Sequence, residues 1–301
     1  MRPDRTVSPK QLRDYSSLFS RGAVKEWMKG NLTSIDFKIK RYDENWYSRT
    51  KRTYIDYLKF VYSVLEYQYQ NEYILKNSFL NDWLIMELGK SDSELYSEFR
   101  IGGAIADLVM FNGISRAFEI KTELDSDKRL NSQLDQYRKV FNEIFLIVPA
   151  SKIEEYETYD SRIGIISFDI LSPKRFQVVR SAGRNTHIDA EALMHIFHTN
   201  EYKEIVTHHY GQLPKVTSFN QFEVCKDLIA KIPQNELNQL FINKMKSRAG
   251  NYGLSARYYK EFNQLSLALR MNMKNRKQLF SILKTPLNVN VIDCNHVLPT
   301  T

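Results

Sequence analysis

The spacing of apolar residues changes abruptly along the chain, and this change limits the folds that are open to it. Between residues 54 and 89 apolar side chains recur every three or four positions, which predicts helix. They then fall into three short runs typical of strands, at 95–101, 104–111 and 116–122. Because Gly102-Gly103 and Asn112-Gly113 separate these runs, we expect tight turns between three neighbouring strands.

A second helix and further strands are predicted after this point. Residues 130–141 carry an apolar stripe at helical spacing, and residues 144–149 are wholly apolar, as in a strand buried on both faces. Two more strands are expected at 162–169 and 175–181. This order predicts an α/β core with a mixed central sheet flanked by helices, and with helical extensions at its N- and C-terminal sides.

Charge is distributed unevenly over three expected segments: a basic helical segment at 1–60, a core at 61–182 and a helical, basic region at 183–301. Residues 1–60 carry 14 Lys and Arg against 7 Asp and Glu, a net charge of +7. Residues 241–285 carry 10 against 1, a net charge of +9, whereas residues 61–240 carry 19 against 26, a net charge of −7. Basic flanks suit a polyanion and an acidic centre suits cations. Solvated helix faces would carry the same charges, and this alternative stays open.

Cysteine content and hydropathy exclude several classes of protein. The two cysteines, Cys225 and Cys294, are too few for a disulfide framework or a four-cysteine iron–sulfur cluster, and they give no support for a thiolate zinc site. No apolar run approaches the roughly 18 residues of a membrane span. Since the N-terminus also lacks the apolar core of a signal peptide, we expect a cytoplasmic protein without a membrane partner.

Two carboxylates interrupt the apolar strands on either side of the second turn. Asp107 and Glu119 are each surrounded by apolar neighbours, where an ionised carboxylate is costly unless it is paired, hydrogen-bonded or bound to a metal. If the turn is centred on Gly113, the two lie opposite each other on one face, with Cβ atoms roughly 5 Å apart. Like charges so placed destabilise a sheet, unless a divalent cation lies between them.

Lys121 is expected on the same strand face as Glu119, because side chains alternate along a strand. Oxygen ligands suit Mg²⁺ or Mn²⁺ rather than zinc. A metal and a neighbouring cation are what hydrolysis of a phosphodiester needs, to activate water and to neutralise the charge that develops on phosphorus. The alternative is an ordinary salt bridge between Asp107 and Lys121, with Glu119 facing solvent.

Asp107, Glu119, Ile120 and Lys121, on a hairpin followed by a helix, resemble the signature of the PD-(D/E)XK nuclease superfamily. Ala106 stands at the position that proline usually fills. The stretch from residue 72 through EIKTELD (119–125) also resembles a bacterial family described only as PD-(D/E)XK-like. The resemblance covers about residues 70–180.

The helix after the hairpin carries a second motif. Gln133 and Tyr137 are spaced i, i+4, so they share one helix face. They are similar to the QxxxY motif of the RecB-like branch, which includes CRISPR-adaptation exonucleases. They are also suited to plain helix packing, and Tyr137 lies on the apolar stripe.

The resemblance implies a restriction-endonuclease-like core over residues 61–182 and an Mg²⁺-dependent (or Mn²⁺-dependent) deoxyribonuclease. Asp107, Glu119 and the carbonyl of Ile120 would bind the metal. The preceding helix would supply a further acidic ligand, Glu72, with Glu87 as the competing choice. A solvated glutamate at a helix start is the plain alternative for Glu72.

The remaining roles also come from the resemblance. Lys121 would orient the attacking water or help to deprotonate it, while Gln133 and Tyr137 would position Lys121 or the scissile phosphate. DNA is the expected substrate, with RNA not excluded, and basic residues would hold its backbone. We expect this from Lys244, Lys246, Arg248, Arg257, Lys274, Arg276 and Lys277.

A rival prediction is a catalytically inactive nucleic-acid-binding or regulatory protein on the same fold. The retention of all five motif side chains favours the nuclease. A bacterial or phage source is expected, and phage defence, repair and mobile-element biology all fit. A protein partner or a homodimer is left open.

Overall fold

The computed structural model describes residues 6–47, 52–88, 93–123, 125, 127–170, 172–248, 250, 252–255 and 257–287. Its described residues fall into two compact units. The sheet unit is Ser78–Gly250, and the helical unit combines Met1–Asn77 with Asn251–Thr301. The boundaries differ from the three expected segments, because the helical region after the sheet is divided between the two units.

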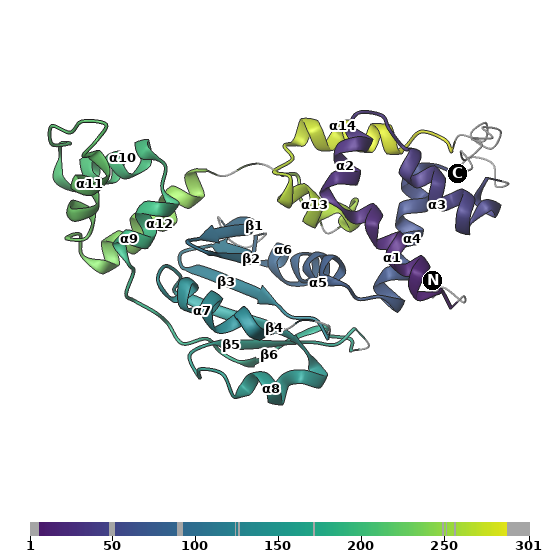
Figure 1. Ribbon diagram of the computed structural model, residues 1–301, viewed down its shortest axis with the longest axis horizontal. Coiled ribbons are helices and arrows are strands. Elements are labelled where there is room, and N and C mark those ends of the chain that lie inside the picture. Colours follow the sequence, from purple (N-terminus) through teal and green to yellow (C-terminus); the bar gives the residue numbers. More distant parts are fainter. Residues whose placement is uncertain are drawn as a thin grey trace, which may run out of the picture. The chain divides into compact units, whose positions relative to one another are not determined.

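A six-stranded mixed sheet is the centre of the sheet unit, as Figure 1 shows. Its strands stand side by side in sequence order. β1–β2, β2–β3 and β5–β6 pair antiparallel, whereas β3–β4 and β4–β5 pair parallel. The strands are β1 (Glu94–Ile101), β2 (Ala104–Phe111), β3 (Ser115–Ile120), β4 (Glu143–Pro149), β5 (Gly164–Phe168) and β6 (Phe176–Arg180). The α/β fold and its mixed sheet are confirmed, and all six strands fall within two residues of the expected positions.

Glycine sets the two tight turns at the start of the sheet. Gly113 lies in a three-residue loop between Phe111 and Ser115, which pair across the hairpin, and its φ of +94° is readily adopted only by glycine. Gly102 also has a positive φ, of +54°, in the turn between β1 and β2. The turn centred on Gly113 is therefore the one that the sequence predicts.

Helices flank both faces of the sheet. On one face, Leu134 and Tyr137 of α7 (Leu130–Arg138) join a buried cluster with Ala117 of β3. On the other face, Phe79 packs against Phe118 and Phe176, with ring centroids 5.2 Å and 5.1 Å away. The remaining helical elements of the sheet unit are η3 (Leu80–Leu84), α6 (Ile85–Leu88), η4 (Asp127–Arg129), η5 (Ala150–Lys152), α8 (Ile153–Glu157), α9 (Ala190–Ile196), α10 (Thr199–Tyr210), α11 (Gln221–Ile229) and α12 (Gln234–Ser247).

The helical unit is assembled from both ends of the described chain. Its elements are α1 (Pro9–Ser16), η1 (Ser17–Phe19), α2 (Arg21–Met28), α3 (Thr33–Tyr42), η2 (Glu44–Trp46), α4 (Tyr54–Gln68), α5 (Glu72–Phe79, up to residue 77), η6 (Lys260–Phe262), α13 (Asn263–Ala268) and α14 (Met273–Leu283). Thr53 bridges to Pro286, and the N–H of Leu287 donates to the carbonyl of Arg52 at 3.0 Å. The N-terminal extension and the last part of the C-terminal extension thus share one core, which includes Trp27, Leu58 and Leu283.

The long helix expected over residues 54–89 is interrupted. α4 ends at Gln68 and α5 begins at Glu72. The side-chain oxygen of Asn71 accepts the backbone N–H of Ile74 at 3.0 Å, which caps the new helix. Gly89, the expected end, lies outside the described residues.

Phe111 is the centre of the aromatic core under the sheet, and its loss should destabilise the protein. It is fully buried, and its ring centroid lies 5.3 Å from that of Phe241 and 5.7 Å from that of Tyr96. We expect Phe111→Ala to lower the free energy of unfolding by about 3–5 kcal/mol, because it leaves a cavity. Urea denaturation followed by circular dichroism measures this. Phe219→Ala is the control, since Phe219 is 97% exposed and should change little.

Candidate active site

The hairpin of β2 and β3 brings two carboxylates together at the end of its ladder. The last paired residues are Leu108 and Phe118, and one further step along this register sets Asp107 against Glu119. Asp107 Oδ2 accepts the backbone N–H of Ile120 at 2.8 Å. The Asp107 charge also acts on Glu119, whose pKa it raises. The expected juxtaposition of the two carboxylates is therefore present.

Glu119 is buried and its carboxylate is held by the helix that follows the hairpin. The residue is 4% exposed. Gln133 Nε2 donates to Glu119 Oε1 at 3.1 Å, and the Tyr137 hydroxyl lies 2.8 Å from Glu119 Oε2. The same hydroxyl lies 2.7 Å from the carbonyl oxygen of Ile105 on β2. These contacts tie α7 to both strands of the hairpin at the acidic pair.

Lys121 completes the cluster. Its Nζ lies 3.4 Å from Glu119 Oε1, and the residue is only 7% exposed. Its backbone N–H donates to the carbonyl of Ile147 on β4 at 2.9 Å, so the main chain is fixed where the side chain enters the site. The plain alternative, with Glu119 facing solvent, is wrong, because Glu119 is buried and lies beside Lys121.

The surroundings of Glu119 bring its pKa close to neutral pH. Burial and the Asp107 charge raise the pKa of Glu119 to about 7, while Lys121 and the Tyr137 hydroxyl oppose this increase. Burial and the neighbouring Glu119 also raise the pKa of Tyr137 far above its ordinary value, so the phenol stays protonated. A cation placed between the carboxylates would remove the repulsion that raises the pKa of Glu119.

The donor set fits a hard divalent cation. Glu119 Oε1 has two donors, Gln133 and Lys121, whereas Oε2 has one, Tyr137, so Oε2 keeps one lone pair for a further partner. Mg²⁺ is commonly bound by one or two carboxylates together with water and phosphate oxygens. Within the described part of the chain, no group of three or more His, Cys, Asp or Glu side chains could hold a metal. Metal binding by Asp107 and Glu119 therefore stays a prediction.

The additional acidic ligand expected from the preceding helix stays a prediction. Glu72 belongs to the helical unit and pairs with Lys76 on α5. The alternative, Glu87, has a side chain outside the described residues. The role of the Ile120 carbonyl also stays a prediction.

The structure places the expected DNA-binding residues in both units. Lys244, Lys246 and Arg248 belong to the sheet unit, where Lys244 pairs with Glu204 and Arg248 with Glu201. Because these two cations are paired with glutamates, less positive charge is available to a polyanion than the sequence alone indicates. In the helical unit, Arg257, Lys274 and Lys277 are exposed.

Arg276 does not fit the expected surface role. It is 5% exposed, and its guanidinium donates to Asn263 Oδ1 at 2.8 Å and to the hydroxyl of Ser266. A guanidinium bound inside the protein cannot reach along a nucleic-acid backbone. The sequence predicted neither this burial nor a pocket nearby, although the Tyr258-Tyr259 pair in a basic stretch was a usable signal.

A protein family described as "Bacteriophage P4 protein cII" matches residues 66–278, which is more than two thirds of the chain. The chain belongs to this family. The match contains both the sheet and the acidic cluster.

Two individual proteins are similar over smaller parts. Protein cII of Enterobacteria phage P4 is 26% identical over 175 residues, which are 56% of this chain and 64% of that protein, less than two thirds of its length. A solved protein of unknown function from Silicibacter pomeroyi is 16% identical. It covers 39% of this chain and 80% of its own, at a TM-score of 0.28.

No helix among the described residues is long and apolar enough to cross a membrane.

The raised pKa of Glu119 predicts how stability depends on pH when no metal is bound. The folded protein holds this proton up to about pH 7, whereas the unfolded chain releases it near 4.5. The folded state therefore binds more protons between these values, and stability falls as the pH rises through this window, by up to about 3 kcal/mol. The glutamine side chain of the Glu119→Gln variant cannot ionise, so the stability of this variant should fall less than that of the wild type over the same pH range.

Melting temperatures in EDTA measure this effect across the same window. The difference between wild type and Glu119→Gln should grow in favour of the variant as the pH rises. A difference that stays constant from acid to neutral pH would show that Glu119 titrates normally.

Proposed function

We propose that this protein is a metal-dependent nuclease of the PD-(D/E)XK type that hydrolyses phosphodiester bonds of DNA. The observation that carries the proposal is the cluster in which the half-buried Asp107 lies beside the buried Glu119 and Lys121. Two like charges and an ammonium share a small volume at the end of a hairpin, and burial raises the pKa of one carboxyl to about 7. Such an arrangement costs stability, and perturbed carboxyls of this kind gather at functional sites.

The architecture supports the same proposal. A mixed sheet carries helices on both faces, and the acidic cluster lies at the junction of β2, β3 and α7. This is the placement expected of a restriction-endonuclease-like core. Membership of the phage cII family agrees with the expected bacterial or phage source.

Asp107, Glu119 and the carbonyl of Ile120 would hold Mg²⁺ or Mn²⁺. The metal, when bound, supplies charge neutralisation at the phosphate and lowers the pKa of water. Lys121 brings a positive charge to the same volume, where its ammonium would orient the attacking water and stabilise negative charge on phosphorus.

Gln133 and Tyr137 act as positioning residues for Glu119. The expected role was to place Lys121 or the phosphate, but their hydrogen bonds go to the two oxygens of the Glu119 carboxylate. By fixing both oxygens from one helix face, they would hold the carboxylate in the orientation that a metal requires. DNA is the substrate we propose, and RNA belongs in the same assay.

Cleavage of plasmid and linear DNA by the purified protein tests the proposal. We expect cleavage with Mg²⁺ and none with EDTA. Asp107→Ala, Glu119→Ala and Lys121→Ala should each reduce the rate at least about 100-fold, because each removes a group that acts on the reacting phosphate. The control is Asp135→Ala, which removes a carboxylate from the exposed side of α7 and should cleave as wild type does.

Two results would contradict the proposal. Wild-type cleavage by Asp107→Ala would place the activity elsewhere. DNA binding without cleavage in any divalent metal would favour the rival, a regulatory or nucleic-acid-binding protein on this fold.

Metal binding is expected to stabilise the folded protein independently of cleavage. Millimolar Mg²⁺ or Mn²⁺ should raise the melting temperature, because the ion binds the folded state only. At a concentration of about 100 times the dissociation constant, the gain is about 2.7 kcal/mol. Glu119→Ala should lose this gain, and Asp135→Ala should keep it. A wild-type melting temperature that is indifferent to Mn²⁺ would argue strongly against the site.

A further inference from the structure

The helical unit contains a pocket of about 440 Å³ beside α14. Its walls combine aromatic rings with cations, and no acidic residue is among the described residues that line it. The aromatic members are Tyr258, Tyr259 and Phe280, and the cations are Arg276, Lys277 and Lys284. This chemistry differs from that of the acidic cluster, and the proposed hydrolysis does not use it.

An aromatic wall is the first part of the argument. Tyr259 and Phe280 stack with ring centroids 3.9 Å apart and planes 20° apart. Tyr258 stands at the rim and is 72% exposed, which is unusual for so large a ring. The exposed Tyr258 ring beside the cavity offers a flat face on which another ring can stack.

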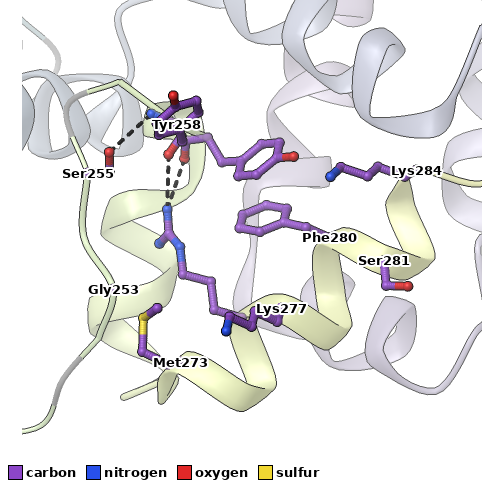
Figure 2. Close-up of a pocket in the computed structure, with 10 residues that line it drawn as sticks. Gly253, Ser255, Tyr258, Met273, Lys277, Phe280, Ser281 and Lys284 are labelled. Carbon is purple, nitrogen blue, oxygen red and sulfur yellow. Dashed lines mark hydrogen bonds between the residues drawn. The ribbon is translucent and has the colours of Figure 1, made fainter.

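Positive charge is the second part. Figure 2 shows Lys284 extending from the end of α14 toward the aromatic rings. Its Nζ lies 5.5 Å from the centroid of the Tyr259 ring. Lys277, one turn before Ser281 on the same helix, is exposed and lines the pocket as well.

Arg276 adds a charge that its hydrogen-bond partners do not neutralise. Besides Asn263 and Ser266, its guanidinium donates to the carbonyl oxygen of Tyr259 at 3.3 Å and to that of Tyr258 at 3.5 Å. All four acceptors are uncharged. Burial lowers the pKa of Arg276 to about 10, so it remains charged at neutral pH, with Glu261 nearby as a partial offset. The pocket therefore has a positive wall that suits an anion.

We propose that this pocket binds a nucleotide unit of single-stranded nucleic acid, its base against Tyr258 and its phosphate at Lys277 and Lys284. A nucleotide combines the flat face and the negative charge that the two walls match, whereas inorganic phosphate would leave the aromatic wall unused. In a duplex the bases already stack on one another, so a single strand or a frayed end presents a base more readily. The choice of nucleic acid over other aromatic anions rests on the proposed function.

Binding of the full-length protein to a short fluorescent oligothymidylate tests this inference in EDTA, where no metal-dependent cleavage occurs. Tyr258→Ala should weaken binding by about 5- to 150-fold, the range measured for removing one stacking partner of a base. Replacing Lys277 and Lys284 together by alanine should flatten the log–log salt dependence by about 0.7 for each phosphate that is no longer neutralised. All three side chains are exposed, so these variants should fold.

The controls separate the pocket from general surface effects. Phe219→Ala removes an exposed aromatic ring of the sheet unit, and Lys25→Ala removes an exposed lysine of the helical unit. Both should bind as wild type does. An abasic oligonucleotide should bind more weakly than oligothymidylate, and thymidine monophosphate should compete better than inorganic phosphate. Competition by the mononucleotide alone, with no binding of the oligonucleotide, would assign the site to free nucleotides and overturn the single-strand proposal.

Equal binding by Tyr258→Ala and Phe219→Ala would also overturn the inference, as would equal binding of abasic and thymidylate strands. These outcomes are independent of catalysis. A protein that binds the strand through this pocket and never cleaves it would contradict the nuclease proposal alone.

Discussion

The buried carboxylate of Glu119 is the constraint on which the arrangement of the sheet unit depends. An ionised group at 4% exposure has to be compensated, and the compensation comes from three side chains. Lys121 lies on the chain just after the same strand, while Gln133 and Tyr137 come from α7. The crossover helix is therefore fixed to the sheet by polar contacts at one end and by apolar packing of Leu134 along its length.

The hairpin would contain no repulsion between like charges if apolar residues stood in place of Asp107 and Glu119. β2 and β3 are otherwise apolar near this point, and the ladder stops at Leu108 and Phe118, where the Asp107 carboxylate accepts a main-chain N–H from the opposite strand. Burial and the neighbouring Asp107 charge raise the pKa of Glu119, so the pair holds unfavourable charge. A fold optimised for stability alone would not keep this pair, which is why we propose it as the functional site.

The helical unit uses its basic residues differently from what their number indicates. The guanidinium of Arg276 donates hydrogen bonds within the unit, and Lys284 faces the ring of Tyr259. In the sheet unit, Glu201 and Glu204 pair with Arg248 and Lys244. A net charge of a segment thus says little about which cations remain available to a partner, because the counter-charges come from other segments.

The sequence by itself determined the strands, their turns and the opposed carboxylates. These features are local: apolar runs define β1 to β6, Gly113 fixes the turn, and the equal distance of Asp107 and Glu119 from it fixes their register. Tertiary structure decided the rest. It brought residues 252–287 into one core with the N-terminal helices, it buried Arg276, and it turned Gln133 and Tyr137 toward Glu119 rather than toward Lys121. Contacts of this kind join residues that are distant in sequence, and local periodicity carries no information about which distant surface a side chain will meet.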